Sequence, residues 1–274
     1  MQYLDPKPNE NFIDCTFGGG GHTKDILEKI EPRGKVLAID WSPEMAKQAA
    51  KKNLIVVCDN FANLKEIVKK NNFNRVKGIL FDLGMSSWHL SESGRGFSFQ
   101  KREPLDMRYS LENQLTAEKI VNYWSKFDIE KILKEYGQEQ FAGQIAERIV
   151  EARKTKQIET TSQLTAVIEK AVPKRYLHGK IHFATRTFQA LRIAVNGELD
   201  NIKETLPQAL EVLEPGGRLV VISFHSLEDR IVKNFFVHEP SLKLLNKKPV
   251  IPVSREIRAN PKARSAKLRA VIKI

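Results

Sequence analysis

The sequence predicts an α/β protein with a doubly wound, mainly parallel sheet that is interrupted by an inserted helical domain. Three observations support this prediction. Short apolar runs that end in polar residues alternate with helical patterns over the first hundred residues. A long region with helical patterns alone follows, and the alternation then resumes after residue 200. Alternating strand and helix patterns are typical of parallel sheets with helices on both faces.

The four strands expected in the first part each end at an aspartate. They cover residues 12–14, 35–40, 54–59 and 77–82, and the aspartates are Asp14, Asp40, Asp59 and Asp82. Helical patterns fill the gaps and cover residues 23–30, 43–53 and 62–71. The carboxyl ends of parallel strands meet at one edge of a sheet, where α/β proteins bind their ligands. We therefore expect these aspartates near the functional site.

After the fourth strand a polar loop over residues 84–107 leads into helical patterns that continue to about residue 196. Helices are expected to begin at Thr116, Asp128 and Thr160. Gln163 follows Thr160 at the spacing of a capping box. We predict a discontinuous α/β domain over residues 1–107 and 198–274, with a helical domain inserted over residues 108–197.

The α/β pattern resumes near residue 201. The predicted elements are a helix over residues 201–213, a turn over 214–217 and a strand over 218–224. A final pair of strands, over 250–253 and 266–274, is expected to form an antiparallel hairpin that closes the sheet.

Composition limits the class of partner. The chain of 274 residues has 45 Lys and Arg against 33 Asp and Glu, a formal charge of +12, which favours a polyanion such as nucleic acid. The two cysteines, Cys15 and Cys58, fall in patterns of buried strands and predict neither a disulfide framework nor a metal site. Neither a 20-residue apolar run nor a leader pattern is visible, so we expect a cytoplasmic protein without a membrane span.

The turn after the first strand, Gly18 to Gly21, lets a ligand approach the backbone closely and opens a helix. A dinucleotide site would place a third glycine where Lys24 stands, which argues against a nicotinamide cofactor. Asp40 ends the second strand where nucleotide-binding folds place an acid for ribose hydroxyls, although such an aspartate can also form a turn. Phe61 could cover an adenine ring or pack in the core.

Longer motifs are much more specific. They are DLGMSSWHLSESGRGFSF at residues 82–99, PLDMR at 104–108, ATRTFQALR at 184–192, SFHSLEDR at 223–230 and NPKARSAKLR at 260–269. In this order they resemble the small-subunit ribosomal RNA methyltransferase H family over nearly the whole chain. The resemblance implies a class I, Rossmann-like S-adenosylmethionine methyltransferase. Its substrate would be the exocyclic amine of a cytidine in the decoding region of 16S RNA, and DNA is not an expected partner.

The resemblance also implies a set of cofactor contacts. They fall on Gly20, Gly21, His22, Asp40, Phe61, Asp82 and His89. His89 stands where the family usually has Gln, and an imidazole can still make one hydrogen bond there.

An acceptor near the cytosine amine would help the reaction, because the lone pair of that amine is delocalised into the ring. We expect Asp82 at the meeting of cofactor and amine, with His225, Ser86 and Ser87 as further contacts and His225 as the second catalytic candidate. For His225 a structural role in the turn is an equal alternative.

RNA contact is expected from two basic stretches. The first comprises Lys170, Lys174, Arg175, Lys180, Arg186 and Arg192, with no acid between them. The second, residues 255–274, has seven basic residues against Glu256. Phosphate contacts position RNA without reading its sequence, but a solvated helix face would look similar. Trp88, Phe97 and Phe99 could stack on a base or simply pack.

Two other functions fit the same residues. One is a methyltransferase that acts on DNA or protein. The other is an RNA-binding assembly factor that has lost catalysis. The oligomeric state and the form of the substrate, naked RNA or assembled subunit, stay open.

Overall fold

The computed structural model describes residues 1–46 and 52–274. Two compact units divide the chain: the first comprises Met1–Gly84 and Leu199–Ile274, and the second comprises Met85–Glu198. The predicted first domain includes residues 85–107. They belong to the second unit, because Phe97, Leu105 and Met107 are buried in its core. The insertion therefore begins directly after Gly84.

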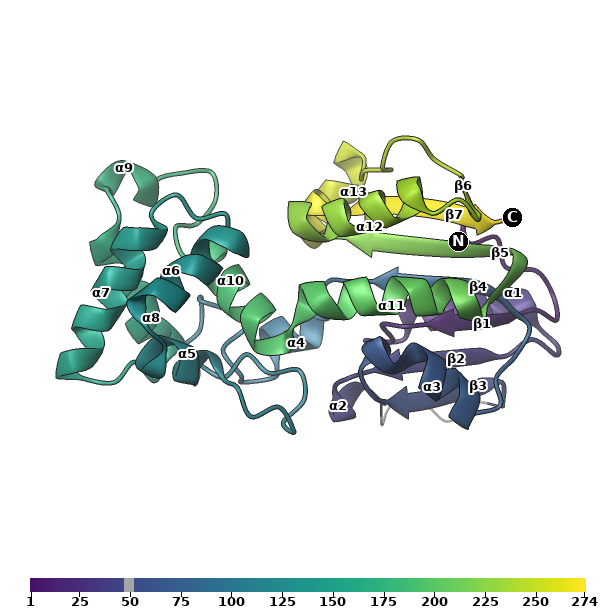
Figure 1. Ribbon diagram of the computed structural model, residues 1–274, viewed down its shortest axis with the longest axis horizontal. Helices are drawn as coiled ribbons and strands as arrows, with labels where there is room; N and C mark the ends of the chain where they lie inside the picture. The colour runs from purple at the N-terminus through teal and green to yellow at the C-terminus, as the bar shows by residue number, and fades with distance from the viewer. Residues whose placement is uncertain (47–51) are drawn as a thin grey trace. The chain divides into compact units, whose positions relative to one another are not determined.

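The first unit is built on a seven-stranded sheet in the order β3-β2-β1-β4-β5-β7-β6 (Figure 1). The strands are β1 Asn11–Asp14, β2 Val36–Asp40, β3 Leu54–Cys58, β4 Val76–Asp82, β5 Leu213–Ser223, β6 Leu242–Leu244 and β7 Lys267–Lys273. Strands β1 to β5 are parallel, and β7 is antiparallel to both β5 and β6. The predicted mainly parallel α/β fold is confirmed.

Helices cover both faces of this sheet. They are α1 Gly21–Ile30, α2 Pro43–Ala46, α3 Leu64–Lys70, α11 Glu198–Val212, α12 Ser226–His238 and α13 Ser254–Ala259. Helices α3, α11 and α12 pack on one face with Ile13 of β1, whereas α1 packs on the other face with Phe12 (Figure 1). Neighbouring residues of a strand point to opposite faces, so a strand buried on both faces is apolar throughout. The helix expected over residues 43–53 is seen over Pro43–Ala46, and residues 47–51 lie outside the described residues.

Three predicted details of the first unit were wrong. Of the strand expected over residues 250–253, Val250 alone bridges to β7, and β6 is the hairpin partner of β7 instead. Pro249 and Pro252 flank that position, and proline has no N–H to donate to a strand pair. The turn expected over residues 214–217 is an irregularity within β5, where Gly216 has φ 75°. Cys58 is exposed, because β3 is an edge strand.

The second unit is helical. Its helices are α4 Ser87–Ser91, α5 Ala117–Tyr123, α6 Lys126–Glu135, α7 Ala142–Thr155, α8 Thr161–Ala171, α9 Lys174–Leu177 and α10 Thr185–Asn196. Thr116 caps α5, and Thr160 with Gln163 forms the predicted capping box of α8. Helix α6 begins earlier than expected, because Ser125 is its N-cap and accepts the N–H of Asp128. No helix among residues 1–46 and 52–274 is long and apolar enough to span a membrane.

Candidate functional site

Asp14 anchors the turn that follows β1. It is fully buried, and its two carboxylate oxygens accept hydrogen bonds from the Thr16 N–H at 3.2 Å and from the Thr23 hydroxyl at 2.7 Å. Burial raises the pKa of Asp14, although these hydrogen bonds act against the rise. Asp14 is one of the strand-end aspartates that we expect near the functional site. Its contacts show that it ties the start of the turn to α1.

The glycine turn combines left-handed backbone with open surface. Gly18 and Gly20 have φ 50° and 73°, and a Cβ on Gly20 would lie 3.0 Å from the Phe17 ring. A Cβ on Gly19 or Gly21 would meet nothing within 4 Å. Gly20, the N-cap residue of α1, has no side chain that could cap the helix. The first N–H groups of a helix lack partners within the helix and attract anionic or polar ligand groups. The turn is therefore suited to a ligand that approaches the main chain.

Asp40, at the end of β2, is joined to this turn. Its Oδ2 accepts the Gly18 N–H at 2.7 Å, and its Oδ1 accepts the Ser42 N–H at 2.8 Å. Burial is the main cause that raises the pKa of Asp40 to about 6, and the charges of Asp14 and Glu44 add to the rise. Each carboxylate oxygen has two lone pairs, so both retain capacity for a further donor such as a ribose hydroxyl.

Asp82, at the end of β4, lies beside the same turn. Its N–H donates to the Thr16 hydroxyl at 2.7 Å, and its Oδ2 lies 3.4 Å from Nε2 of His22. Its Oδ1 is buried and has no hydrogen-bond partner in the part of the chain that the structure describes. Buried polar atoms in native proteins almost always have a partner. The free oxygen therefore fits a ligand that brings a hydrogen-bond donor to this point.

His22 is the second residue of α1 and is partly exposed. Its hydrogen bond with Asp82 is the main cause that raises its pKa, and the charge of Asp14 contributes. A protonated His22 donates to Asp82 Oδ2, so the two residues form a charge-assisted pair next to the glycine turn.

Phe61 opens the short 3₁₀ helix Phe61–Asn63 after β3. Its ring is half-buried and meets the Phe81 ring edge-on, with the centroids 5.6 Å apart. Its carbonyl accepts the hydroxyl of Thr205 in α11 at 3.0 Å. The ring is thus held in place while part of it stays accessible, so its role against an adenine ring stays a prediction.

His225 is the N-cap of α12. Its Nδ1 accepts the Glu228 N–H at 3.4 Å, and the Glu228 carboxylate accepts the N–H groups of Phe224 and His225 at 2.8 and 3.2 Å. Its Nε2 lies 3.1 Å from Glu228 Oε1, but without the geometry of a hydrogen bond. These contacts give His225 a structural role as a helix cap. Its catalytic role stays a prediction.

His89 belongs to the second unit and is buried there. Its Nδ1 lies 2.7 Å from the Ser86 hydroxyl, and its ring meets the rings of Trp88, Phe97 and Tyr109 at centroid distances of 5.3, 5.1 and 5.0 Å. These contacts are those of a packed aromatic cluster. The contacts of His89 are thus explained by packing within the second unit, and its contact with the cofactor stays a prediction.

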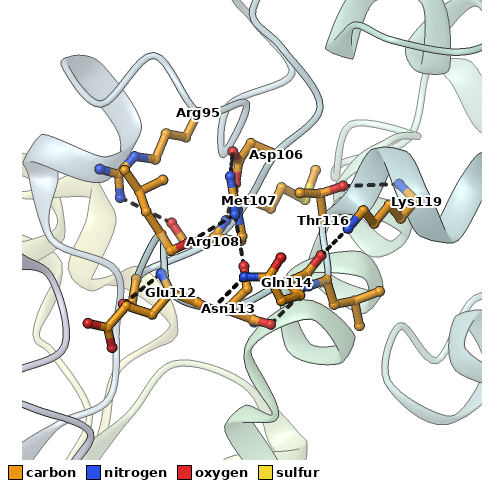
Figure 2. A network of polar contacts seen from close by, with 12 residues as sticks. Arg95, Asp106, Met107, Arg108, Glu112, Asn113, Gln114, Thr116 and Lys119 are labelled. Atoms are coloured by element: carbon orange, nitrogen blue, oxygen red, sulfur yellow. Dashed lines mark hydrogen bonds and ion pairs between the residues drawn. The ribbon is translucent and has the colours of Figure 1, made fainter.

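The loop after His89 is held by a network of polar contacts (Figure 2). Arg108 forms a bidentate ion pair with Asp106, with hydrogen bonds of 2.8 and 2.7 Å. It also donates to the Asn113 carbonyl at 2.8 Å. Arg95 donates to the Tyr109 carbonyl at 3.1 Å. Arg95, Asp106 and Arg108 of the motifs at 82–99 and 104–108 thus fix the conformation of a long loop.

The first basic stretch separates into two groups. Lys170, Lys174, Arg175 and Lys180 are exposed. Arg186 donates to the Gln138 carbonyl at 2.8 Å, and Arg192 forms a two-pronged pair with Glu198 at 2.8 and 2.9 Å. The first four side chains are therefore the ones available for phosphate. Phe99 stacks on His182, with the centroids 4.3 Å apart, and so already has an aromatic partner.

Comparison with known proteins gives one consistent result. The model of the MraW methylase family matches residues 1–274. The relatives include proteins with the name ribosomal RNA small subunit methyltransferase H. The protein of Dehalococcoides mccartyi is 45% identical and covers 100% of this chain and 84% of its own. That of Acetivibrio thermocellus is 44% identical, with coverages of 98% and 94%, and that of Halothermothrix orenii is 43% identical, with 100% and 96%.

Proposed function

Because the chain belongs to the MraW methylase family, we propose that it methylates the exocyclic amine of a cytidine in small-subunit (16S) ribosomal RNA near the decoding site. The methyl donor is S-adenosyl-L-methionine. The names of the relatives support a small-subunit ribosomal RNA as substrate. The main observation that supports this chemistry is that Oδ1 of Asp82 is buried and has no hydrogen-bond partner among the described residues. The protein is expected to act in the cytoplasm.

The residues around the glycine turn fit the cofactor. The main chain of Gly21 and His22 offers N–H groups at the start of α1 to the carboxylate of the methionine part. The Gly20 N–H donates to the Phe17 carbonyl at 2.8 Å, so Gly20 contributes a backbone that the cofactor can approach closely. Asp40 retains lone pairs for the ribose hydroxyls, and Phe61 lies after β3 where it can cover the adenine. The bound cofactor supplies a methyl group activated by the positive sulfur. His89 is proposed as a further contact from the second unit.

Asp82 orients the amine that receives the methyl group. Its Oδ2 is engaged by His22, so Oδ1 is the oxygen that accepts a hydrogen bond from the cytidine amine. This hydrogen bond raises the electron density on the nitrogen and favours a pyramidal amine, whose lone pair is less delocalised into the ring. As the new carbon–nitrogen bond forms, the carbon–sulfur bond of the methyl donor would break and leave a neutral thioether. The Asp82 carboxylate would accept the proton that the amine loses. Holding the reacting atoms in line supplies much of the remaining rate enhancement.

The second unit is proposed to contact RNA. Lys170, Lys174, Arg175 and Lys180 lie on α8, on α9 and in the segment that follows α9, and they are exposed. Contacts of this kind fix the position of a polynucleotide through its phosphates and leave the choice of base to the site.

Mass spectrometry of small-subunit RNA from cells with and without this protein tests the proposal. In cells that contain the protein we expect a methyl group on a cytidine amine in the decoding region, and in cells without it we expect none. Adding the purified protein and S-adenosylmethionine to the unmethylated RNA should restore the methyl group. Methylation of DNA or of protein alone in the same assays would contradict the RNA substrate. If calorimetry detects no binding of S-adenosylmethionine, the protein would instead be an assembly factor that has lost catalysis.

A further inference from the structure

The segment between β6 and β7 carries a strong positive charge. Its basic side chains are Lys247, Lys248, Arg255, Arg258, Lys262 and Arg264, and all six are exposed. Glu256 is the single acid between residues 245 and 266. We call residues 247–264 the C-terminal basic segment. It contains α13 and the 3₁₀ helix Pro261–Ser265, which pack on each other, and Ala263 is buried beneath them.

The basic residues of β7 have partners within the protein, whereas five of those in the segment have none among the described residues. Lys267 and Arg269 pair with Asp229 of α12 at 3.2 and 2.7 Å, and Lys273 donates to two main-chain carbonyls. In contrast, no ion pair or hydrogen bond from a side chain of Lys247, Lys248, Arg255, Arg258 or Arg264 is found within the described ranges 1–46 and 52–274. Five cations without an acidic partner on one short segment favour an anionic ligand.

The segment lies at the same edge of the sheet as Asp82. In the sheet register Asp82 is beside Ile222 of β5, and Ile222 is beside Leu268 of β7. Two strand spacings separate Asp82 from Leu268, which is about 10 Å. Figure 1 shows α13 at the end of the sheet where β4 and β5 end.

Both ends of the segment converge on Leu268. Val250 and Leu268 exchange two main-chain hydrogen bonds of 2.9 Å, and Asn246 donates to the carbonyls of Lys248 and Leu268 at 2.8 and 3.0 Å. Arg264 lies just before β7 in the chain. The positive charge is therefore held next to the carboxyl edge by the sheet itself.

We propose that the C-terminal basic segment binds the sugar-phosphate backbone of the RNA on one side of the target cytidine. This inference rests on the proposed function. A polynucleotide whose base reaches Asp82 must pass over the carboxyl edge of the sheet, and the segment borders that edge. Arginine matches the geometry of a phosphate group with two parallel hydrogen bonds.

An anionic membrane is the competing partner, because Ile251 and Val253 are 63% and 66% exposed beside these cations. A basic surface with exposed apolar side chains also suits a lipid headgroup region. The position of the segment beside Asp82 favours RNA, because the target base must reach Asp82 at this edge of the sheet. Membrane binding would not depend on the distance to Asp82.

The test compares two triple variants with equal loss of charge. The first is Arg255→Gln/Arg258→Gln/Arg264→Gln. The control is Lys29→Gln/Arg33→Gln/Lys69→Gln, whose residues are exposed at the ends of α1 and α3, at the opposite edge of the same sheet. Filter binding measures the Kd for small ribosomal subunits or deproteinised 16S RNA, whichever the wild-type protein methylates, across a range of salt concentrations. Calorimetry with S-adenosylmethionine confirms that each variant is folded.

We expect the first variant to bind RNA about tenfold more weakly or worse, and the slope of log Kd against log salt to fall by about 2 for three lost phosphate contacts. The control is expected to stay within about twofold of wild type. Glu256→Lys, which adds charge to the same segment, is expected to bind RNA more tightly.

Equal losses in the two triple variants would overturn the proposal, as would unchanged RNA binding in the first. A different outcome is that the wild-type protein and the control sediment with phosphatidylglycerol vesicles while the first variant does not, although that variant still binds RNA normally. This result would assign the segment to a membrane instead. A wild-type protein that neither binds nor methylates RNA would refute the proposed function itself, which is a different result from either of these.

Discussion

Nε2 of His22 lies 3.4 Å from Oδ2 of Asp82, and this pair joins the first turn of α1 to the end of β4. The pair leaves Oδ1 of Asp82 buried without a hydrogen-bond partner in the described part of the chain. One oxygen of the carboxylate is thus held in place while the other is kept for a ligand.

Asp82→Asn is expected to lower kcat for methyl transfer by about 10² to 10⁴, because the amide is neutral and cannot take a proton from the amine. Methyl incorporation into small-subunit RNA at saturating S-adenosylmethionine measures the effect. Asp25→Asn, an exposed position on α1, is the matched control and should behave as wild type. An Asp82→Asn protein with near wild-type kcat would rule out the proposed role of Asp82.

His22 is expected to stabilise the fold in its protonated form, because its hydrogen bond with Asp82 raises its pKa. A raised pKa of a histidine contributes stability that is complete below the pKa of the unfolded chain and is lost as the pH rises through the folded value. The free energy of unfolding should therefore exceed that of His22→Gln by at most about 1 kcal/mol at about pH 5.5, since the pair is partly exposed. Urea unfolding should show this difference shrinking by about pH 8.5. A difference that stays constant with pH would contradict the charged pair.

Asp40 is expected to make cofactor binding depend on pH. Burial raises its pKa to about 6, so the carboxyl group gains a proton as the pH falls through that value. Ribose hydroxyls donate more strongly to the ionised form, so the Kd for S-adenosylmethionine should rise below about pH 6, by at most about tenfold per pH unit. Calorimetry from about pH 5 to 8 measures this. Asp40→Asn should bind weakly without the same dependence, and an identical pH profile in both proteins would exclude Asp40 as the cause.

His225 can be assigned by separating its two candidate roles. Loss of the cap in His225→Ala should lower the free energy of unfolding by about 1 kcal/mol, and His225→Asn should recover most of it, because Asn is a good N-cap residue. If capping is its whole role, methyl transfer by His225→Asn should be close to wild type. A stable His225→Asn protein with kcat reduced a hundredfold would instead support the catalytic role.

Much of the first unit follows from local sequence. The strands that end at Asp14, Asp40 and Asp82 contain the short apolar runs 12–13, 36–39 and 79–81, and such runs are buried on both faces of a sheet. The capping box of Thr160 and Gln163 is also local, since it depends on residues three apart. The glycine turn and the aspartates at the strand ends could therefore be placed at one edge before the structure was known.

Partners distant in the chain were less accessible. The boundary after Gly84 could not be read from the polar composition of the loop, because the anchors Phe97, Leu105 and Met107 are isolated apolar residues without periodicity. The pairing of β7 with β6 depends on which strand reaches the sheet edge, and a short strand of three residues has little pattern of its own.

By itself, the sequence determined the parallel sheet, the glycine turn and the identity of the residues at the strand ends, because hydrophobic period and turn chemistry act over a few neighbouring residues. The tertiary structure alone decided how these residues are used. It paired His22 with one oxygen of Asp82, made His225 a cap and neutralised Lys267 and Arg269 with Asp229. It left Arg255, Arg258 and Arg264 of the C-terminal basic segment without an ion pair among the described residues. Contacts between residues that are far apart in the chain decide whether a charged side chain forms an ion pair within the protein or is available to a ligand. These contacts exist only in the folded molecule.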